Sequence, residues 1–131
     1  MILLDTHVWV WWIGAPERIS AAARDRIQEA MEASGIYISS ISSWEVSLLV
    51  KKKRLDLTMA PADWVSRSEA LPFFHFVPVD NRIFLLSNDL PGDFHDDPAD
   101  RIITATALTL NLPLVTRDQR ILDYPHLETI W

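Results

Sequence analysis

The sequence contains no cysteine and no hydrophobic run long enough to span a membrane. Without cysteine, the 131-residue chain has no disulfide, no thiolate metal site and no cysteine nucleophile, which fits a reducing compartment. No stretch approaches the roughly 20 apolar residues of a membrane-spanning helix, and Asp5 interrupts the first apolar run. No basic region precedes that run, as it would in a secretory signal. We therefore expect a cytoplasmic protein without a membrane segment.

An excess of positive charge is also missing. The 12 basic and 18 acidic residues give a net charge of −6, whereas general nucleic-acid-binding proteins are usually basic. This balance excludes a broad electrostatic footprint for nucleic acid. It does not exclude a nuclease in which a bound cation neutralises several of the acids. The basic residues are local instead, in the cluster Lys51–Arg54 and at Arg101 and Arg117.

Hydrophobic residues are abundant, at 49% of the chain with six tryptophans, so we expect one folded domain over residues 1–131. Strand-like segments alternate with helical ones, which predicts an α/β fold with a parallel sheet of 4–5 strands between helices. The expected strands are Met1–Leu4, Ile36–Ser39, Phe74–Val79, Leu112–Val115 and, at the edge, Leu127–Trp131. The expected helices start after Thr6 and Ser20, at Ser42, Pro61, Asn81 and Pro98, and at Asp118.

Four carboxylates stand where an apolar run gives way to an expected helix: Asp5, Glu45, Asp100 and Asp118. In an open parallel sheet the strand-to-helix junctions share one edge, so these acids can meet in one crevice. Four negative charges a few ångströms apart repel unless a cation lies among them. Oxygen-only ligands suit Mg²⁺ or Mn²⁺. The pattern therefore predicts a metal-dependent hydrolase site.

Each acid also has a purely structural explanation as part of a helix cap, worth roughly 1 kcal/mol. Asp5 or Thr6 would cap the first helix, and capping boxes would pair Ser42 with Glu45, Asp97 with Asp100 and Thr116 with Gln119. Capping and metal binding are compatible roles. We favour the metal site because all four acids stand at the same kind of junction between an apolar run and a helix. In addition, Asp5 directly follows a buried strand, where an unpartnered charge is costly.

The chain strongly resembles the PIN-domain family and, within it, the VapC-like type II toxins. The matching segments are Leu4-Asp5-Thr6-His7, Ser43-Trp44-Glu45, the long run from Phe94 to Ala107, and Val115-Thr116-Arg117-Asp118. The resemblance implies a PIN-like three-layer fold and a single-strand endoribonuclease dependent on Mg²⁺ or Mn²⁺. Such a toxin cleaves cellular RNA to arrest translation, and a cognate antitoxin inhibits it.

The resemblance also assigns the family's four acids to Asp5, Glu45, Asp100 and Asp118, as catalytic residues and metal ligands. It further implies a homodimer, and an antitoxin segment lying along a hydrophobic groove. A basic side chain of the antitoxin that entered the acidic pocket would displace the metal.

Several neighbouring residues keep two interpretations. Thr116 would either contact the site water or a phosphate, or cap a helix. Asp97 would either support a metal ligand without touching the metal, or cap a helix. Arg101 and Arg117 bind RNA phosphates or pair with the acids. The cluster Lys51–Arg54 is a solvated helix end or a phosphate track.

Other functions compete with the toxin. A haloacid-dehalogenase-type phosphatase would need an Asp where His7 stands, and a receiver domain would need a late Lys where Arg117 and Asp118 stand. A housekeeping RNA-processing PIN nuclease and a non-catalytic PIN-like module that binds RNA or protein remain as alternatives.

Overall fold

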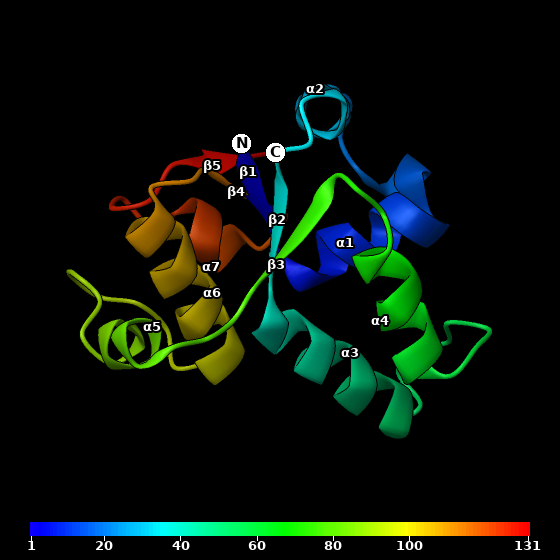
Figure 1. The fold of residues 1–131 in the computed structure, drawn as a ribbon. Helices are drawn as coiled ribbons and strands as arrows, with labels where there is room; N and C mark the ends of the chain where they lie inside the picture. The colour runs from blue at the N-terminus through cyan, green and yellow to red at the C-terminus, as the bar shows by residue number, and fades with distance from the viewer.

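The sheet places its first strand at the centre. The computed structural model describes residues 1–131, and its five parallel strands are ordered β3-β2-β1-β4-β5 (Figure 1). The chain builds one half of the sheet from β1 through β2 to β3 and then crosses to β4 and β5 on the other side of β1. The order therefore reverses between β1 and β4, and ligands bind at such a switch point, beyond the carboxyl ends of the strands.

The strands and helices follow the expected order with shifted ends. The strands are β1 (Ile2–Leu4), β2 (Ile36–Ser39), β3 (Phe74–Val77), β4 (Leu114–Val115) and β5 (Thr129–Ile130). The helices are α1 (Thr6–Gly14), η1 (Pro16–Arg18), α2 (Ala21–Glu32), α3 (Ser40–Lys51), α4 (Pro61–Glu69), α5 (Asn81–Ser87), α6 (Pro98–Leu110) and α7 (Gln119–Leu122). The α/β fold with a parallel sheet flanked by helices is confirmed.

Alternation along β1 divides the core between the two faces of the sheet. Ile2 and Leu4 pack with Trp9 in the larger cluster, while Leu3 packs with Ile103 in a second cluster. In Figure 1, α1, α2 and α4 accordingly lie to one side of the sheet and α5, α6 and α7 to the other. The helices packed on both faces of the sheet fix the positions of the carboxyl ends of β1 and β4.

The helix caps decide between the two alternatives for α1 and differ from the expectations for α3 and α7. Asp5, not Thr6, caps α1, because its Oδ1 accepts from the Thr6 amide at 2.8 Å. Ser39 caps α3, so the expected capping box of Ser42 with Glu45 is wrong and Glu45 lies one turn inside the helix. Asp118 caps α7, and the capping box of Thr116 with Gln119 is also wrong. The expected cap of α6 by Asp97 is confirmed.

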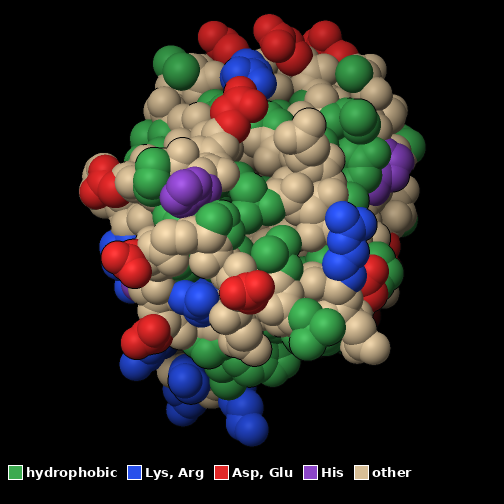
Figure 2. Space-filling view, turned by 90° about the vertical axis from the view of Figure 1, so that its left-hand side faces the viewer, with side chains coloured by type: hydrophobic (Ala, Val, Ile, Leu, Met, Phe, Trp, Pro, Cys, Tyr) green, Lys and Arg blue, Asp and Glu red, His purple; other side chains and the backbone are tan.

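Most aromatic side chains pack inside, but a few apolar ones are open to solvent. Trp44 on α3 and Phe84 and Leu85 on α5 are exposed. On the face that presents α5, α6 and α7, hydrophobic side chains lie between charged ones, and basic side chains gather at the lower edge (Figure 2). No helix is both long enough and apolar enough to cross a membrane.

Candidate functional site

The four acids lie around one hollow of about 260 Å³ at the switch point of the sheet. Asp5 follows β1, Glu45 projects from α3, Asp100 stands in the first turn of α6, and Asp118 caps α7 after β4. All four line this hollow. The structure thus brings together side chains from four separate segments of the chain.

Two threonines fix the acidic side chains. Asp5 is only 3% exposed, and its Oδ2 accepts a hydrogen bond of 2.7 Å from the hydroxyl of Thr116, which is fully buried. The same Thr116 oxygen accepts from the Asp118 amide at 3.0 Å, so one side chain joins two of the acids. On the other side, the Thr6 hydroxyl donates to Glu45 Oε1 at 2.6 Å. Thr6 Oγ1 also lies 2.7 Å from the buried Ser42 hydroxyl, which supports this arrangement from behind.

Burial and mutual repulsion act on Glu45 and Asp100. Burial is the main cause that raises the pKa of Glu45 to about 7, and the charges of Asp5, Asp100 and Asp97 add to it against the opposing hydrogen bond from Thr6. Burial likewise raises the pKa of Asp100 to about 6, despite a hydrogen bond with His95. Both carboxyls therefore resist ionisation when no cation is near.

The guanidinium group of Arg120 partly neutralises the negative charge of Asp118 and Asp100. Arg120 donates from Nη2 to Asp118 Oδ2 at 3.0 Å, and this same nitrogen lies 3.5 Å from Asp100 Oδ2. Burial alone would raise the pKa of Asp118, but the hydrogen bonds and charge of Arg120 outweigh it and lower the pKa. The Arg120 side chain is 60% exposed, so it can swing away from the carboxylates.

His95 is a second neighbour of Asp100. Its Nε2 lies 2.6 Å from Asp100 Oδ2, and its ring stacks on Phe94 at a centroid distance of 4.4 Å. Ligand atoms of His95, Asp100 and Asp118 all lie within 4.8 Å of one another. His95, Arg120 and Thr6 were not among the site residues predicted from the sequence. His95 lies five residues from Asp100 and Arg120 two residues from Asp118, whereas Thr6 bonds to Glu45 across 39 residues. Only the folded chain shows these contacts.

The expected outer residues fall into different places. Asp97 is exposed and caps α6 through the Asp100 amide at 2.9 Å. Arg101 points away from the acids and donates to the carbonyl oxygens of Ser87, Phe94 and His95, so it binds the loop before α6.

The remaining basic residues are divided between the site and the surface. Arg117 is exposed beside Trp11, with its guanidinium carbon 5.9 Å from the ring centroid. Of the cluster Lys51–Arg54, only Arg54 lines the acidic hollow. The sequence did not point to Arg18, which lines it as well.

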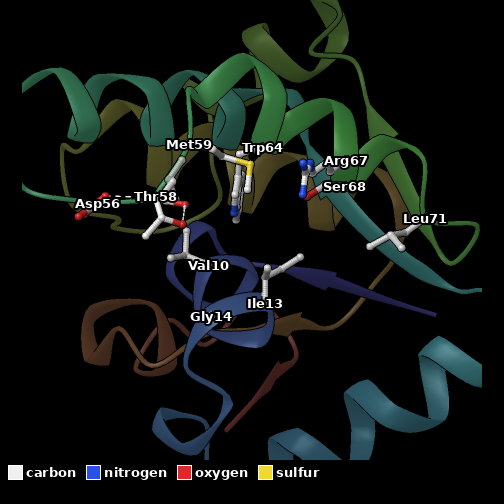
Figure 3. A pocket seen from close by; sticks show the side chains of 11 residues that line it. Val10, Ile13, Gly14, Asp56, Thr58, Met59, Trp64, Arg67, Ser68 and Leu71 are labelled. Carbon is white, nitrogen blue, oxygen red and sulfur yellow. Dashed lines mark hydrogen bonds between the residues drawn. The ribbon is translucent and has the colours of Figure 1, made fainter.

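A larger, mainly apolar groove of about 520 Å³ adjoins the acidic hollow. Val10, Ile13 and Gly14 of α1 face Met59 and the α4 side chains across it (Figure 3). Trp64 forms part of its wall and packs on Trp9 at a centroid distance of 4.5 Å. Val10 lines both hollows, so the groove leads to the acids.

Comparison with known proteins identifies the family of the chain. The PIN domain profile matches residues 2–127. The chain belongs to the PIN-domain family. This PIN domain is 33% identical to ribonuclease VapC22 of Mycobacterium tuberculosis over 132 residues, covering 99% of this chain and 98% of that protein.

Solved structures share the fold of this PIN domain. VapBC2 from Rickettsia felis, bound to a DNA fragment from its promoter, gives a TM-score of 0.71 at 18% identity, covering 98% and 97% of the two chains. A toxin-antitoxin complex from Klebsiella pneumoniae gives 0.63 at 24% identity, covering 95% and 93%.

Proposed function

We propose that this PIN domain is a metal-dependent single-strand endoribonuclease and the toxin of a toxin–antitoxin pair. The observation that carries the proposal is the convergence of Asp5, Glu45, Asp100 and Asp118 on one hollow, with two threonine hydroxyls holding them. The 33% identity to a protein named as a ribonuclease supports RNA as the substrate. The housekeeping nuclease and the non-catalytic module are the alternatives to this proposal.

The donor set fits a hard divalent cation. Asp5, Asp100 and Asp118 would hold Mg²⁺ or Mn²⁺, because all offer carboxylate oxygens to the same hollow. Burial is the main cause of the raised pKa values of Glu45 and Asp100, and a cation at this place would offset the smaller contribution from the neighbouring negative charges. When bound, the ion would lower the pKa of a water molecule and neutralise charge on the phosphate.

Glu45 is suited to move a proton. Its Oε1 is engaged by Thr6, while no protein donor holds Oε2, which is left to accept a proton from the attacking water. Its place at the hollow beside the proposed metal ligands suits it to act as a general base. Thr116 orients Asp5 and Asp118 from below, so its role in the proposal is to position carboxylates.

The apolar groove offers a docking place for the antitoxin. A helix with an apolar face would fit between α1 and α4, where Trp64 and Leu71 line the groove (Figure 3). Val10 lines both the groove and the acidic hollow. A basic side chain of the bound helix could therefore extend past Val10 into the acidic hollow and occupy the place of the metal. The homodimer stays a prediction, for which the exposed Phe84 and Leu85 on α5 offer an apolar surface.

Cleavage of total cellular RNA by the purified protein tests the nuclease. We expect discrete fragments with Mg²⁺ or Mn²⁺, none with EDTA, and none from the Asp5→Asn variant. Asp25→Asn, on the exposed side of α2, is the matched control and should cleave as the unmodified protein does. Folded protein that cleaves nothing with any metal would favour the binding module, and equal cleavage by Asp5→Asn would reject the assigned site.

Expression in cells separates a toxin from a housekeeping nuclease. The chain produced alone should arrest growth, and co-production of the protein encoded next to it should restore growth. Glu45→Gln should be harmless without a partner. Growth arrest that no neighbouring gene relieves would contradict the toxin–antitoxin assignment while leaving the nuclease intact.

A further inference from the structure

Arginines without a carboxylate partner stand at the acidic hollow. Arg18 and Arg54 line it together with the four acids, and Arg117 lies beside Trp11, another residue of its wall. The only arginine in the ion pairs of the structure is Arg120. The other guanidinium groups therefore do not neutralise the acids by direct contact and are free to bind a further anion.

Arg18 is held in place at the rim of the hollow. It ends the short helix η1, and the next residue, Ile19, is buried in the main core. Its guanidinium carbon lies 4.6 Å from the centroid of the Trp11 ring, a cation–π distance. No side-chain hydrogen bond or ion pair engages the Arg18 guanidinium, so its N–H donors are open to a ligand. Arg18 is exposed, and its contact with Trp11 restricts where its charge lies.

The end of α3 brings Arg54 to the same hollow. The Lys53 amide donates to the Val50 carbonyl at 3.0 Å, and the Arg54 amide to the Leu49 carbonyl at 2.9 Å. These two bonds form a Schellman turn, with Lys53 in the left-handed region at φ 58°. The turn folds Arg54 back beside Leu49, and both line the hollow. Lys51 and Lys52 stay exposed on the outside of this turn.

We propose that Arg18 and Arg54 form a phosphate-binding subsite for single-stranded RNA, with Arg117 at its outer edge. This inference rests on the proposed nuclease function. A divalent cation on the carboxylates would cancel two of their negative charges, and the arginines would supply a positive wall for the phosphodiester. Guanidinium groups match phosphate oxygens in geometry and bind them with two N–H donors.

Binding of a fluorescent 12-nucleotide single-stranded RNA, measured against salt concentration, tests the subsite. Ca²⁺ replaces the catalytic metal, because its looser oxygen coordination favours binding over turnover. Arg18→Ala and Arg54→Ala should each weaken binding about tenfold and reduce the salt slope by about 0.7, the loss of one phosphate contact on a single strand. Arg18→Lys keeps the charge but loses the stacked fork, so its affinity should be intermediate.

Arg26→Ala, on the exposed side of α2, is the matched control and should bind RNA as the unmodified protein does. If Arg18→Ala and Arg54→Ala behave like this control, the subsite is wrong, while cleavage by the unmodified protein would still uphold the nuclease. If the unmodified protein binds no RNA, both proposals fall. If the arginine variants lose only the antitoxin complex, the arginines belong to the protein interface and the RNA subsite is rejected.

Discussion

Glu45→Gln is expected to remove a large part of the pH dependence from the stability of the metal-free protein. Burial is the main cause that raises the pKa of Glu45 from its ordinary value of 4.5 to about 7 in the folded chain. Below pH 4.5 the carboxyl is protonated in both the folded and the unfolded states. Between these two values the unfolded chain loses its proton first, so the free energy of unfolding falls as the pH rises. Above pH 7 the loss is complete.

The size of this effect follows from the shift. Each pKa unit corresponds to about 1.4 kcal/mol, which gives about 3 kcal/mol for Glu45, and roughly 2 kcal/mol after allowance for its remaining contact with solvent. A domain of this size has a total stability of about 5–15 kcal/mol, so the change is easily measured. Asp100, with a pKa of about 6, adds a fall of the same sign that ends at lower pH.

Urea denaturation in EDTA at pH 5 to 8 measures the effect. The unmodified protein should lose stability up to about pH 7, and Glu45→Gln should lose much less between pH 6 and 7.5. Gln keeps the oxygen that accepts from Thr6, so the substitution changes charge more than packing. Adding Mn²⁺ should restore stability mainly at the high-pH end. An equal fall in both proteins, or a rise in stability between pH 5 and 7 in the unmodified protein, would refute the reasoning.

Three other substitutions follow from the contacts of the site. Thr116→Val should cost about 2 kcal/mol in urea denaturation and reduce cleavage, because its hydroxyl joins two carboxylates; stability and activity equal to the unmodified protein would contradict this. Arg120→Ala should raise the affinity for Mn²⁺ in calorimetry, because the guanidinium competes for the same oxygens; an unchanged or lower affinity would show no competition. Arg101→Ala should make residues 88–97 more sensitive to limited proteolysis, and equal sensitivity would argue against its role in holding that loop.

The parts of the fold that depend on local signals were predictable. The continuous apolar run before Asp5 marked β1, and Asp97 followed by Pro98 marked the start of α6. The start of α3 was predicted less well, because a run of serines offers several equivalent caps and Ser39 rather than Ser42 is used. The parallel sheet followed from the alternation of strands and helices, but the sequence did not give the strand order that creates the switch point.

Contacts between distant residues could not be predicted from the sequence. Thr116 bonds to Asp5 across 111 residues, so its position suggested proximity to the site but not the joining of two acids. Arg101 is the neighbour of Asp100, yet successive residues on a helix point about 100° apart, and Arg101 binds the loop before α6 instead. Arg18 carries no signal in sequence, because only folding brings η1 to the acidic hollow.

Binding of Mn²⁺ in calorimetry tests most directly the central claim that the converging carboxylates form one metal site. The account predicts saturable binding to the unmodified protein at pH 7.5, at least tenfold weaker binding to Asp100→Asn, and unchanged binding to Asp25→Asn on the outer side of α2. Equal affinity of Asp100→Asn and the unmodified protein, with both shown to be folded, would contradict it.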